Sequence, residues 1–350
     1  MKVVERLGRR KQEARAGLEL ARQKPLAAPS QSPESFAKEA TRRFGPLLQL
    51  LALPGLDPTA LASGAEEAML ASAQPPEDNF AVRLGAIAAG LARGGADKLT
   101  LLPSPLLLPL GSWMAEQVAL RTGGVTPVSD EPQGRKDAYG LDRLFFSMAL
   151  AGEAHDMTYL AEAGHPVVQW TLESPAELFG ALVRWEIAAE ALGALLEIAP
   201  LAVVPLSEAG APPGEPSLRA RGLALFADPV HTQILRKAAG TLGPQAAAAA
   251  PSWIAAHLAL ADAGGCIVLL PRFAQTPHLQ NELRTLQGAI RGATRIACTS
   301  APARGLVLEL TAGPGAAQKL PPGALRIHAE DGDAQTIIQA LHVAVQLISR

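Results

Sequence analysis

Short apolar runs alternate with longer stretches of helical spacing along most of the chain. The clearest runs cover residues 98–103, 144–150 and 166–172. A helical pattern follows each run, which is typical of βαβ units in a parallel sheet covered by helices on both faces. The same alternation predicts further strands at 223–227, 266–270, 294–299, 305–311 and 324–328, with helices at 229–242, 251–262, 276–290 and 333–348. We therefore expect an α/β fold.

The first 24 residues carry a different pattern, a thin apolar stripe at helical spacing surrounded by charge. Eight basic side chains stand there beside three acidic ones, so the segment has a net charge of +5. Pro25 ends this amphipathic helix, and the following PLAAPSQSPE has the composition of a linker. We expect a tethered helix that binds a protein partner, with the docking residues Arg6, Arg9, Arg10, Leu7 and Leu18.

Four segments follow from these patterns. They are a basic amphipathic helix over 1–24, a flexible linker over 25–34, a helical connector over 35–95 and one α/β domain over 96–350. No repeat of fixed period is visible in the sequence.

The overall composition narrows the range of partners. With 31 Lys and Arg against 33 Asp and Glu, the chain lacks the charge for coating nucleic acid or an anionic membrane. Cys266 and Cys298 are the only cysteines, too few for a disulfide framework or a four-thiolate zinc site, and both stand in apolar stretches. We therefore expect a cytoplasmic protein. No apolar run reaches the roughly 18–20 residues of a membrane-spanning helix.

Motifs that hold phosphate, dinucleotides or metals are absent from the sequence. It contains no GxxxxGK[ST] loop, no GxGxxG after a strand and no HExxH, and its seven histidines are scattered. We therefore expect no metal site. The best physical candidate for a ligand site is a polar loop in the region where parallel strands end, containing Asp130, Glu131, Arg135, Lys136 and Asp137. A solvated polar loop is the alternative interpretation.

Several consecutive stretches, in order, resemble the glucose-6-phosphate isomerase family. The stretches Asp97–Pro132, Asp137–Leu150 and Ala161–Pro200 are similar to the family's second sugar-isomerase (SIS) subdomain, in the form found in bacterial fusions of transaldolase and glucose-6-phosphate isomerase. Leu270–Thr299 continues the match, which covers about residues 40–345. The resemblance implies a three-layer α/β/α SIS sandwich with a mainly parallel sheet. It also implies interconversion of glucose 6-phosphate and fructose 6-phosphate without a metal or an organic cofactor.

The catalytic parts of that family are missing at the matching positions. Aligning Trp113 and Thr122 places Leu120 where the family has its proton-transferring glutamate, and an apolar side chain cannot abstract a proton. Glu116, one helical turn earlier, is a weak substitute. The family's first SIS subdomain, which supplies its phosphate loop, has no counterpart, so the resemblance covers about half of an isomerase.

We therefore expect a catalytically inactive SIS protein that senses a phosphosugar or binds another protein, as a homo- or hetero-oligomer. The remaining candidates for a ligand cleft are Ser104, Arg121, Thr122, Asp142 and Arg143. In the alternative interpretation, Asp142 and Arg143 form a structural salt bridge in a loop. The alternative function is an active phosphosugar isomerase that uses replacement residues or a partner chain.

Overall fold

The chain forms two compact units. The computed structural model describes residues 2–23, 38, 42, 44, 47, 51, 78–153, 156–200, 216–241, 248–262, 265–274, 276–300, 305–312, 320 and 323–349. Unit 1 comprises Met1–Ser129 and Leu141–Leu201, and unit 2 comprises Asp130–Gly140 and Ala202–Arg350. The expected linker and most of the expected connector lie outside the described residues.

This division corrects the expected single domain over residues 96–350. Each unit contains its own sheet, and the chain passes between the units at residues 129–130, 140–141 and 201–202. The strands alternate with helices in the same manner on both sides of these crossings. The pattern of apolar runs therefore does not indicate where one unit ends and the other begins.

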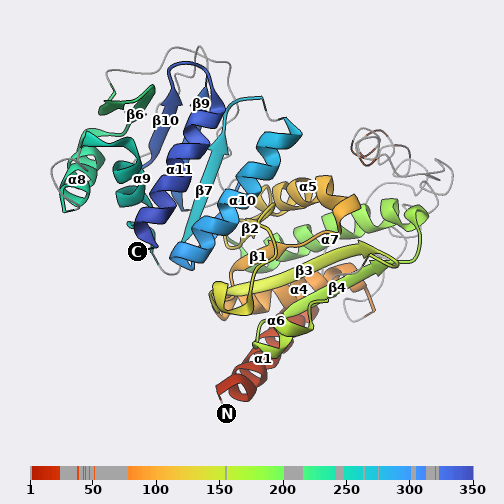
Figure 1. Ribbon diagram of the computed structural model, residues 1–350. Coiled ribbons are helices and arrows are strands. Elements are labelled where there is room, and N and C mark those ends of the chain that lie inside the picture. The colour runs from red at the N-terminus through yellow and green to blue at the C-terminus, as the bar shows by residue number, and fades with distance from the viewer. Residues whose placement is uncertain are drawn as a thin grey trace. The chain divides into compact units, whose positions relative to one another are not determined.

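Unit 1 is built on a fully parallel sheet with the strand order β2-β1-β3-β4 (Figure 1). The strands are β1 Lys98–Leu101, β2 Thr126–Val128, β3 Arg143–Leu150 and β4 Val167–Leu172. The helices are α1 Lys2–Gln23, α4 Phe80–Arg93, α5 Leu108–Ala119, α6 Thr158–Glu162 and α7 Leu178–Leu196, with short 3₁₀ turns at Pro105–Leu107 and Pro175–Glu177.

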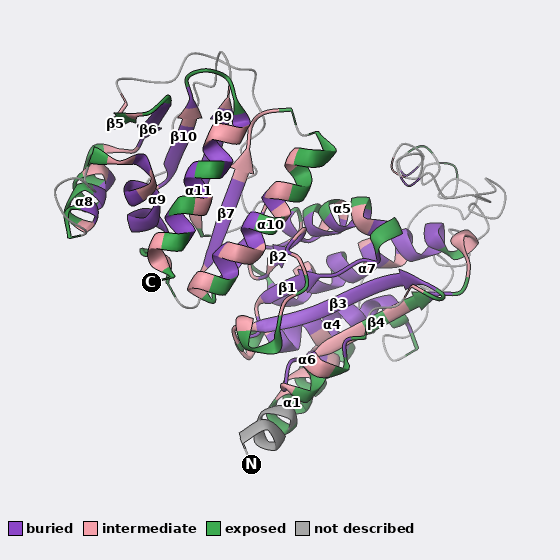
Figure 2. Cartoon of the chain, in the orientation of Figure 1, coloured by how far each residue is buried: buried purple, intermediate pink, exposed green. Residues whose placement is uncertain are grey.

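The apolar core of unit 1 lies between its sheet and the helices α4, α5 and α7. Strand β3 is buried along its whole length (Figure 2). The Phe146 ring on β3 lies 4.7 Å from the Trp185 ring on α7, and the Trp185 indole nitrogen donates to the Met114 carbonyl on α5 at 3.1 Å. These contacts hold α5 and α7 on one face of the sheet.

Helix α1 packs against α4, so the expected helix forms but is not merely tethered. Its Gly17 approaches the α4 backbone so closely that a Cβ atom there would clash with the Ala86 carbonyl oxygen. Arg10 donates to the carbonyl oxygen of Leu141 at 2.7 Å and pairs with Glu13 at 2.6 Å. The basic residues of the helix are thus partly used inside unit 1.

The proposed docking residues of α1 differ in their surroundings. Arg9 is exposed and pairs with Glu13 at 2.8 Å, and Leu18 is half-buried. Arg6 and Leu7 lie in the helix, but their side chains are outside the described part of the chain.

Unit 2 contains a mixed sheet with the order β5-β6-β10-β9-β7-β8. Its parallel strands are β7 Cys266–Pro271, β8 Ala297–Thr299, β9 Leu306–Ala312 and β10 Leu325–Ala329. The strands β5 Leu218–Ala220 and β6 Leu223–Phe226 extend it as an antiparallel edge. The helices are α8 Pro229–Gly240, α9 Ala250–Leu258, α10 Pro277–Thr294 and α11 Ala334–Ile348, with a 3₁₀ turn at Lys136–Ala138.

All four long helices of unit 2 pack on one face of its sheet. They form a contiguous layer in the order α8, α9, α11 and α10, over a core that includes Leu225, Leu269, Leu308 and Ile327. Among the described residues of unit 2, no helix covers the opposite face. The expected α/β fold is confirmed, and most of the connection between β9 and β10 lies outside the described residues.

The two units share one strand order. In unit 1 the first to fourth strands are arranged 2-1-3-4, and the four parallel strands β7, β8, β9 and β10 repeat this arrangement as β8-β7-β9-β10. A helix precedes the first strand of each set, another joins the first strand to the second, and a third follows the fourth. The sequence shows no fixed period although the topology recurs.

Side-chain caps and prolines explain where several helices begin. Asn79 accepts from the first amides of α4, Asp228 caps α8, Thr276 caps α10 and Asp333 caps α11. Proline occupies the first helical position of α8 and α10, where no amide hydrogen bond is lost. The strands and helices predicted from residue 98 onward are confirmed to within a few residues, whereas β2 and β5, each three residues long, were not predicted.

We predict that Gly85→Ala destabilises unit 1. A Cβ atom at Gly85 on α4 would clash with the Ala188 carbonyl oxygen on α7. Separating two packed helices or straining their backbones costs about 1–3 kcal/mol. Urea unfolding at constant pH measures the change in the free energy of unfolding.

The matched control is Gly292→Ala on α10, where nothing lies within 4 Å of the added methyl group. This variant should keep or raise the stability by up to about 1 kcal/mol, because alanine favours a helix over glycine. Equal stability of the two variants would show that the α4–α7 contact is not tight.

Candidate functional site

The polar groups best placed for function in unit 1 lie where the strand order reverses. In an open parallel sheet, ligands bind outside the carboxyl ends of the strands at such a switch point. The order β2-β1-β3-β4 puts this point between β1 and β3. The residues that follow these two strands are therefore the first to consider.

Ser104 and Glu153 meet at this switch point. The buried Ser104 hydroxyl donates to Glu153 Oε2 at 2.9 Å. The segment after β1 stays bound to β3, because the Leu102 amide donates to Phe146 and the Ser104 amide donates to Met148, both at 2.8 Å. Two backbone hydrogen bonds thus fix the position of the serine.

Glu153 reaches the serine from the turn after β3. Gly152 adopts a φ of 86°, which favours glycine, and the Glu153 amide closes the turn on the Leu150 carbonyl at 3.0 Å. A hydroxyl and a carboxylate together can accept and donate hydrogen bonds to the hydroxyl groups of a polar ligand. Sequence reasoning named Ser104 but missed Glu153, which stands in a stretch without a recognisable motif.

Arg121 and Thr122 stand away from this pair, at the end of α5 that leads into β2. Arg121 contacts Glu190 at 3.2 Å and Gln117 at 2.8 Å. The Thr122 hydroxyl donates to the Ile198 carbonyl and accepts from the Gly124 amide. These contacts fasten a turn, and no polar group of the switch point takes part in them.

Asp142 and Arg143 lie at the opposite edge of the sheet, where β3 begins. Arg143 is paired in register with Lys98, the first residue of β1. Asp142 contacts Lys98 Nζ at 3.2 Å, and Arg143 donates to the Thr100 hydroxyl at 3.1 Å. The structural alternative for these two residues was therefore right in kind, but the partner of Asp142 is Lys98 and not its neighbour in the sequence.

Burial disfavours the charged form of Lys98, but its two carboxylate partners outweigh this effect. Asp97 contributes a hydrogen bond and ion pair at 2.7 Å, and Asp142 adds the second. The pKa of Lys98 is raised above its ordinary value as a result. The amino edge of the sheet thus holds a charged cluster that anchors β1 to β3.

Leu120, aligned with the family's catalytic base, directly follows α5, and the substitute Glu116 lies within that helix. Leu120 follows the last turn of the helix and its side chain is 45% exposed. Glu116 is exposed one turn earlier. Because α5 returns from the end of β1 to the start of β2, neither residue stands at the carboxyl edge that carries Ser104.

The polar loop chosen from the sequence belongs to unit 2 and is largely engaged there. Glu131 is buried, contacts Arg291 at 3.1 Å and accepts from the Cys298 amide at 3.2 Å. Asp130 accepts from the Ser300 hydroxyl at 3.2 Å. The first two acidic residues of the loop therefore hold it against α10 and β8, which corrects both the ligand-site and the solvated interpretation for them. Arg135 and its neighbours are exposed.

A buried histidine pair joins α8 to α9 in unit 2. His231 Nε2 lies 2.8 Å from His257 Nδ1, and His257 Nε2 lies 3.1 Å from the Val307 carbonyl oxygen. A carbonyl only accepts, so His257 carries its proton on Nε2, and His231 Nε2 must be the donor to His257 Nδ1. The geometry assigns both tautomers.

Burial, together with the neighbouring His231, lowers the pKa of His257 to about 3. Burial also lowers the pKa of His231, an effect that the charge of Asp228 partly offsets. Both rings are therefore neutral near pH 7. Among the described residues, no three His, Cys, Asp or Glu side chains gather as a metal site would require.

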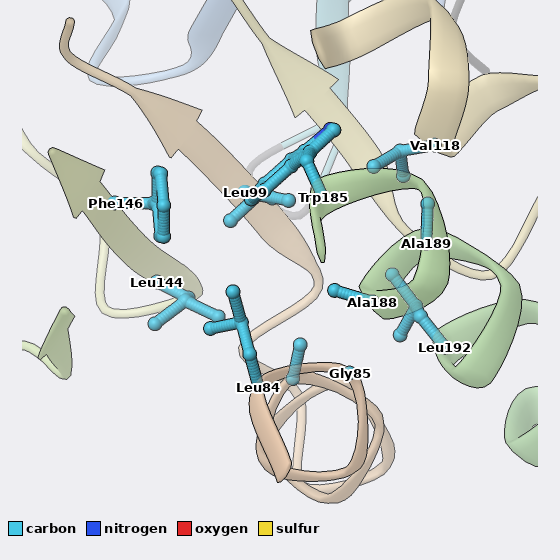
Figure 3. A pocket seen from close by; sticks show the side chains of 11 residues that line it. Leu84, Gly85, Leu99, Val118, Leu144, Phe146, Trp185, Ala188, Ala189 and Leu192 are labelled. Atoms are coloured by element: carbon cyan, nitrogen blue, oxygen red, sulfur yellow. The ribbon is translucent and has the colours of Figure 1, made fainter. Parts of the chain in front are cut away.

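An apolar cavity of about 20 Å³ lies between α4, α7 and the sheet of unit 1 (Figure 3). Leu84, Leu99, Phe146, Trp185 and Leu192 line it. It has room for one water molecule but presents carbon to it, and such cavities stay dry. The cavity is packing space and not a ligand site.

The described residues define an α/β protein with two units that share the strand order 2-1-3-4 and a buried polar pair at one switch point. No family model matches the chain, and no curated protein sequence matches it. A structural comparison finds a hypothetical protein, TT0462, from Thermus thermophilus. The two chains are 11% identical, over 90% of this chain and 92% of that chain, with a TM-score of 0.23. A likeness at this TM-score carries no argument. No helix in the described part of the chain is long and apolar enough to cross a membrane.

We predict that the histidine pair makes unit 2 less stable in acid. The folded-state pKa of His257 lies below the ordinary value of 6.5, so the unfolded chain binds a proton that the folded chain does not. The contribution is fully present above about pH 6.5 and is lost as the pH falls towards 3. The slope reaches at most about 1.4 kcal/mol per pH unit for one such group.

Urea unfolding between pH 7.5 and pH 5 measures this dependence. His257→Gln should flatten the dependence, because glutamine can donate to the Val307 carbonyl without titrating. The control is His278→Gln, since the His278 side chain is 74% exposed. The same pH dependence in the His257 variant and in the original protein would contradict the assignment.

Proposed function

We propose that this chain is a member of the glucose-6-phosphate isomerase family that has lost the isomerase reaction and senses a phosphosugar. The Ser104–Glu153 pair carries the proposal, because it places a hydroxyl and a carboxylate at the switch point of unit 1. Such a pair suits the hydroxyl groups of a sugar, each of which donates one hydrogen bond and accepts others.

The two units change what the family resemblance implies about the architecture. The resemblance implied that one of two SIS subdomains is absent. The chain has two units with the order 2-1-3-4, so its architecture has a second unit where the sequence pattern indicated none.

The loss of the isomerase reaction is proposed from the base position. Leu120 is apolar, and Glu116 points to solvent from the same helix. Removing a general base commonly costs about 10²–10⁴ in rate. No cofactor is part of this proposal.

An active isomerase is the second candidate because of one observation. Glu153 is a carboxylate at the switch point, and a carboxylate there could move a proton between neighbouring carbons of a sugar. In that case Glu153 would replace the base that the family carries on α5.

A protein partner held by α1 is a weaker candidate. Arg10 already binds the Leu141 carbonyl and Glu13 within unit 1, and Gly17 faces α4. Arg9 and Leu18 are the described docking residues that keep exposed surface. Location in the cytoplasm and assembly as an oligomer remain part of the proposal.

We predict that Glu153→Gln weakens binding of fructose 6-phosphate and of free fructose about tenfold or more, since a hydrogen bond to a charged group contributes about 1.5–3 kcal/mol. Calorimetric titration of the full chain measures the dissociation constants. Ser104→Ala should show a smaller loss. Glu190→Gln is the control, because Glu190 is an exposed carboxylate on α7.

The same preparations, assayed for conversion of fructose 6-phosphate to glucose 6-phosphate, separate the two candidates. Binding without turnover supports the sensor. Turnover that Glu153→Gln abolishes would establish the isomerase instead, and sugar binding equal in all variants would rule out the Ser104–Glu153 site.

A further inference from the structure

The carboxyl edge of unit 2 also has a switch point, between β7 and β9. Arg272 directly follows β7, and its amide donates to the Leu310 carbonyl on β9 at 2.8 Å. Thr311 on β9 is paired in register with His328 on β10. Arg272, Thr311 and His328 therefore form one row across three neighbouring strands, spaced about 4.8 Å apart from strand to strand.

A buried charged row lies directly behind this one. Leu270, Glu309 and Arg326 are in register across the same three strands. Side chains two residues apart on a strand share a face, so both rows belong to the face opposite the buried Leu269, Leu308 and Ile327. Among the described residues of unit 2, no helix covers this face.

The Glu309 carboxylate forms ion pairs with two guanidinium groups. Arg326, whose side chain is 1% exposed, approaches Glu309 Oε2 with Nε at 2.5 Å. Arg272 approaches Oε1 with Nε at the longer distance of 3.3 Å and keeps 18% of its side chain exposed. The buried carboxylate orients Arg272 through Nε. Among the described residues, the two terminal nitrogens of Arg272 make no other hydrogen bond.

We propose that Arg272 and His328, the latter oriented by Thr311, bind the phosphate group of a small ligand at the switch point of unit 2. An arginine held through Nε presents its terminal nitrogens in the planar fork that matches two phosphate oxygens. The Thr311 hydroxyl lies 3.1 Å from His328 Nδ1 and 3.4 Å from the Ile327 carbonyl oxygen, so its one proton stays within the protein. When Nδ1 accepts from the threonine, His328 carries its proton on Nε2 and can donate to a ligand. The two terminal nitrogens of Arg272 and His328 Nε2 then offer three donors to a group with three terminal oxygens.

The charges at the two switch points favour this assignment. Unit 1 places a hydroxyl and a carboxylate at its switch point, which suit sugar hydroxyl groups, whereas unit 2 places the cationic Arg272 there, beside a carboxylate already bound to Arg326. The proposal goes beyond the function proposed for unit 1 and does not depend on it, since inorganic phosphate has no sugar hydroxyl groups.

The test is calorimetric titration of the full chain with inorganic phosphate at constant ionic strength, with sodium chloride as the reference salt. The original chain should bind phosphate saturably at one site. Arg272→Gln should weaken that binding at least about tenfold, since it removes a charged bidentate donor. Thr311→Val removes one hydroxyl at nearly constant volume and should weaken binding less, which gives a second measurement if the arginine variant unfolds.

Two controls complete the design. Arg219→Gln removes an arginine on β5 that is 67% exposed and pairs with Glu330, so phosphate binding should persist. Glu153→Gln in unit 1 should also leave it unchanged, so that failure of the sugar site and failure of the phosphate site are distinguishable. No saturable binding to the original chain, or equal binding after Arg272→Gln, would overturn the proposal.

A second arm identifies the source of the phosphate group. Glycerol phosphate and fructose 6-phosphate should compete with inorganic phosphate at this site, and Arg272→Gln should weaken the phosphate-competitive binding of both while leaving the binding of free fructose in unit 1 unchanged. Competition by free fructose would contradict recognition of phosphate at this site.

Discussion

In each unit, a backbone hydrogen bond just beyond the end of a parallel strand positions a residue of the candidate site. The Ser104 amide donates to Met148 on β3, and the Arg272 amide donates to Leu310 on β9, each at 2.8 Å. After β1 and β7 end, the chain remains hydrogen-bonded to β3 and β9. The side chains of Ser104 and Arg272 therefore lie at the carboxyl ends of the parallel strands. Because parallel pairing spaces its bonds evenly, the register of the whole strand sets where each residue emerges.

The two switch points use this common frame for opposite chemistry. In unit 1 a buried hydroxyl faces a carboxylate, and the charged pairs that stabilise the strands, around Lys98, lie at the other edge. In unit 2 the stabilising carboxylate, Glu309, lies within the sheet and orients Arg272 at the carboxyl ends of the strands. One architecture can therefore present an acidic site and a basic site, and the difference depends on which strand position carries the buried carboxylate.

The sequence predicted the elements well and the assembly poorly, for a physical reason. Apolar runs and caps are local, so β7, α10 and α11 were predicted within a few residues. Residues that contact one another in the fold are often far apart in the sequence, so no sequence pattern identified Glu153 as the hydrogen-bond partner of Ser104. The division into units failed for the same reason, since Asp130–Gly140 folds with unit 2 although both flanking segments belong to unit 1.

The basic helix shows that basic side chains can be used inside the unit that carries them. The sequence predicted that this helix binds a protein partner, and Arg10 binds a backbone carbonyl and Glu13 within unit 1. Carbonyl oxygens at the ends of helices and strands carry partial negative charge, and a guanidinium satisfies them without any acidic residue. A Cβ atom at Gly17 would clash with the α4 backbone, whereas nothing lies within 4 Å of one at Gly8 in the same helix. A glycine within a helical pattern weakens the helix by about 1 kcal/mol, and only the folded structure shows which glycine close packing requires.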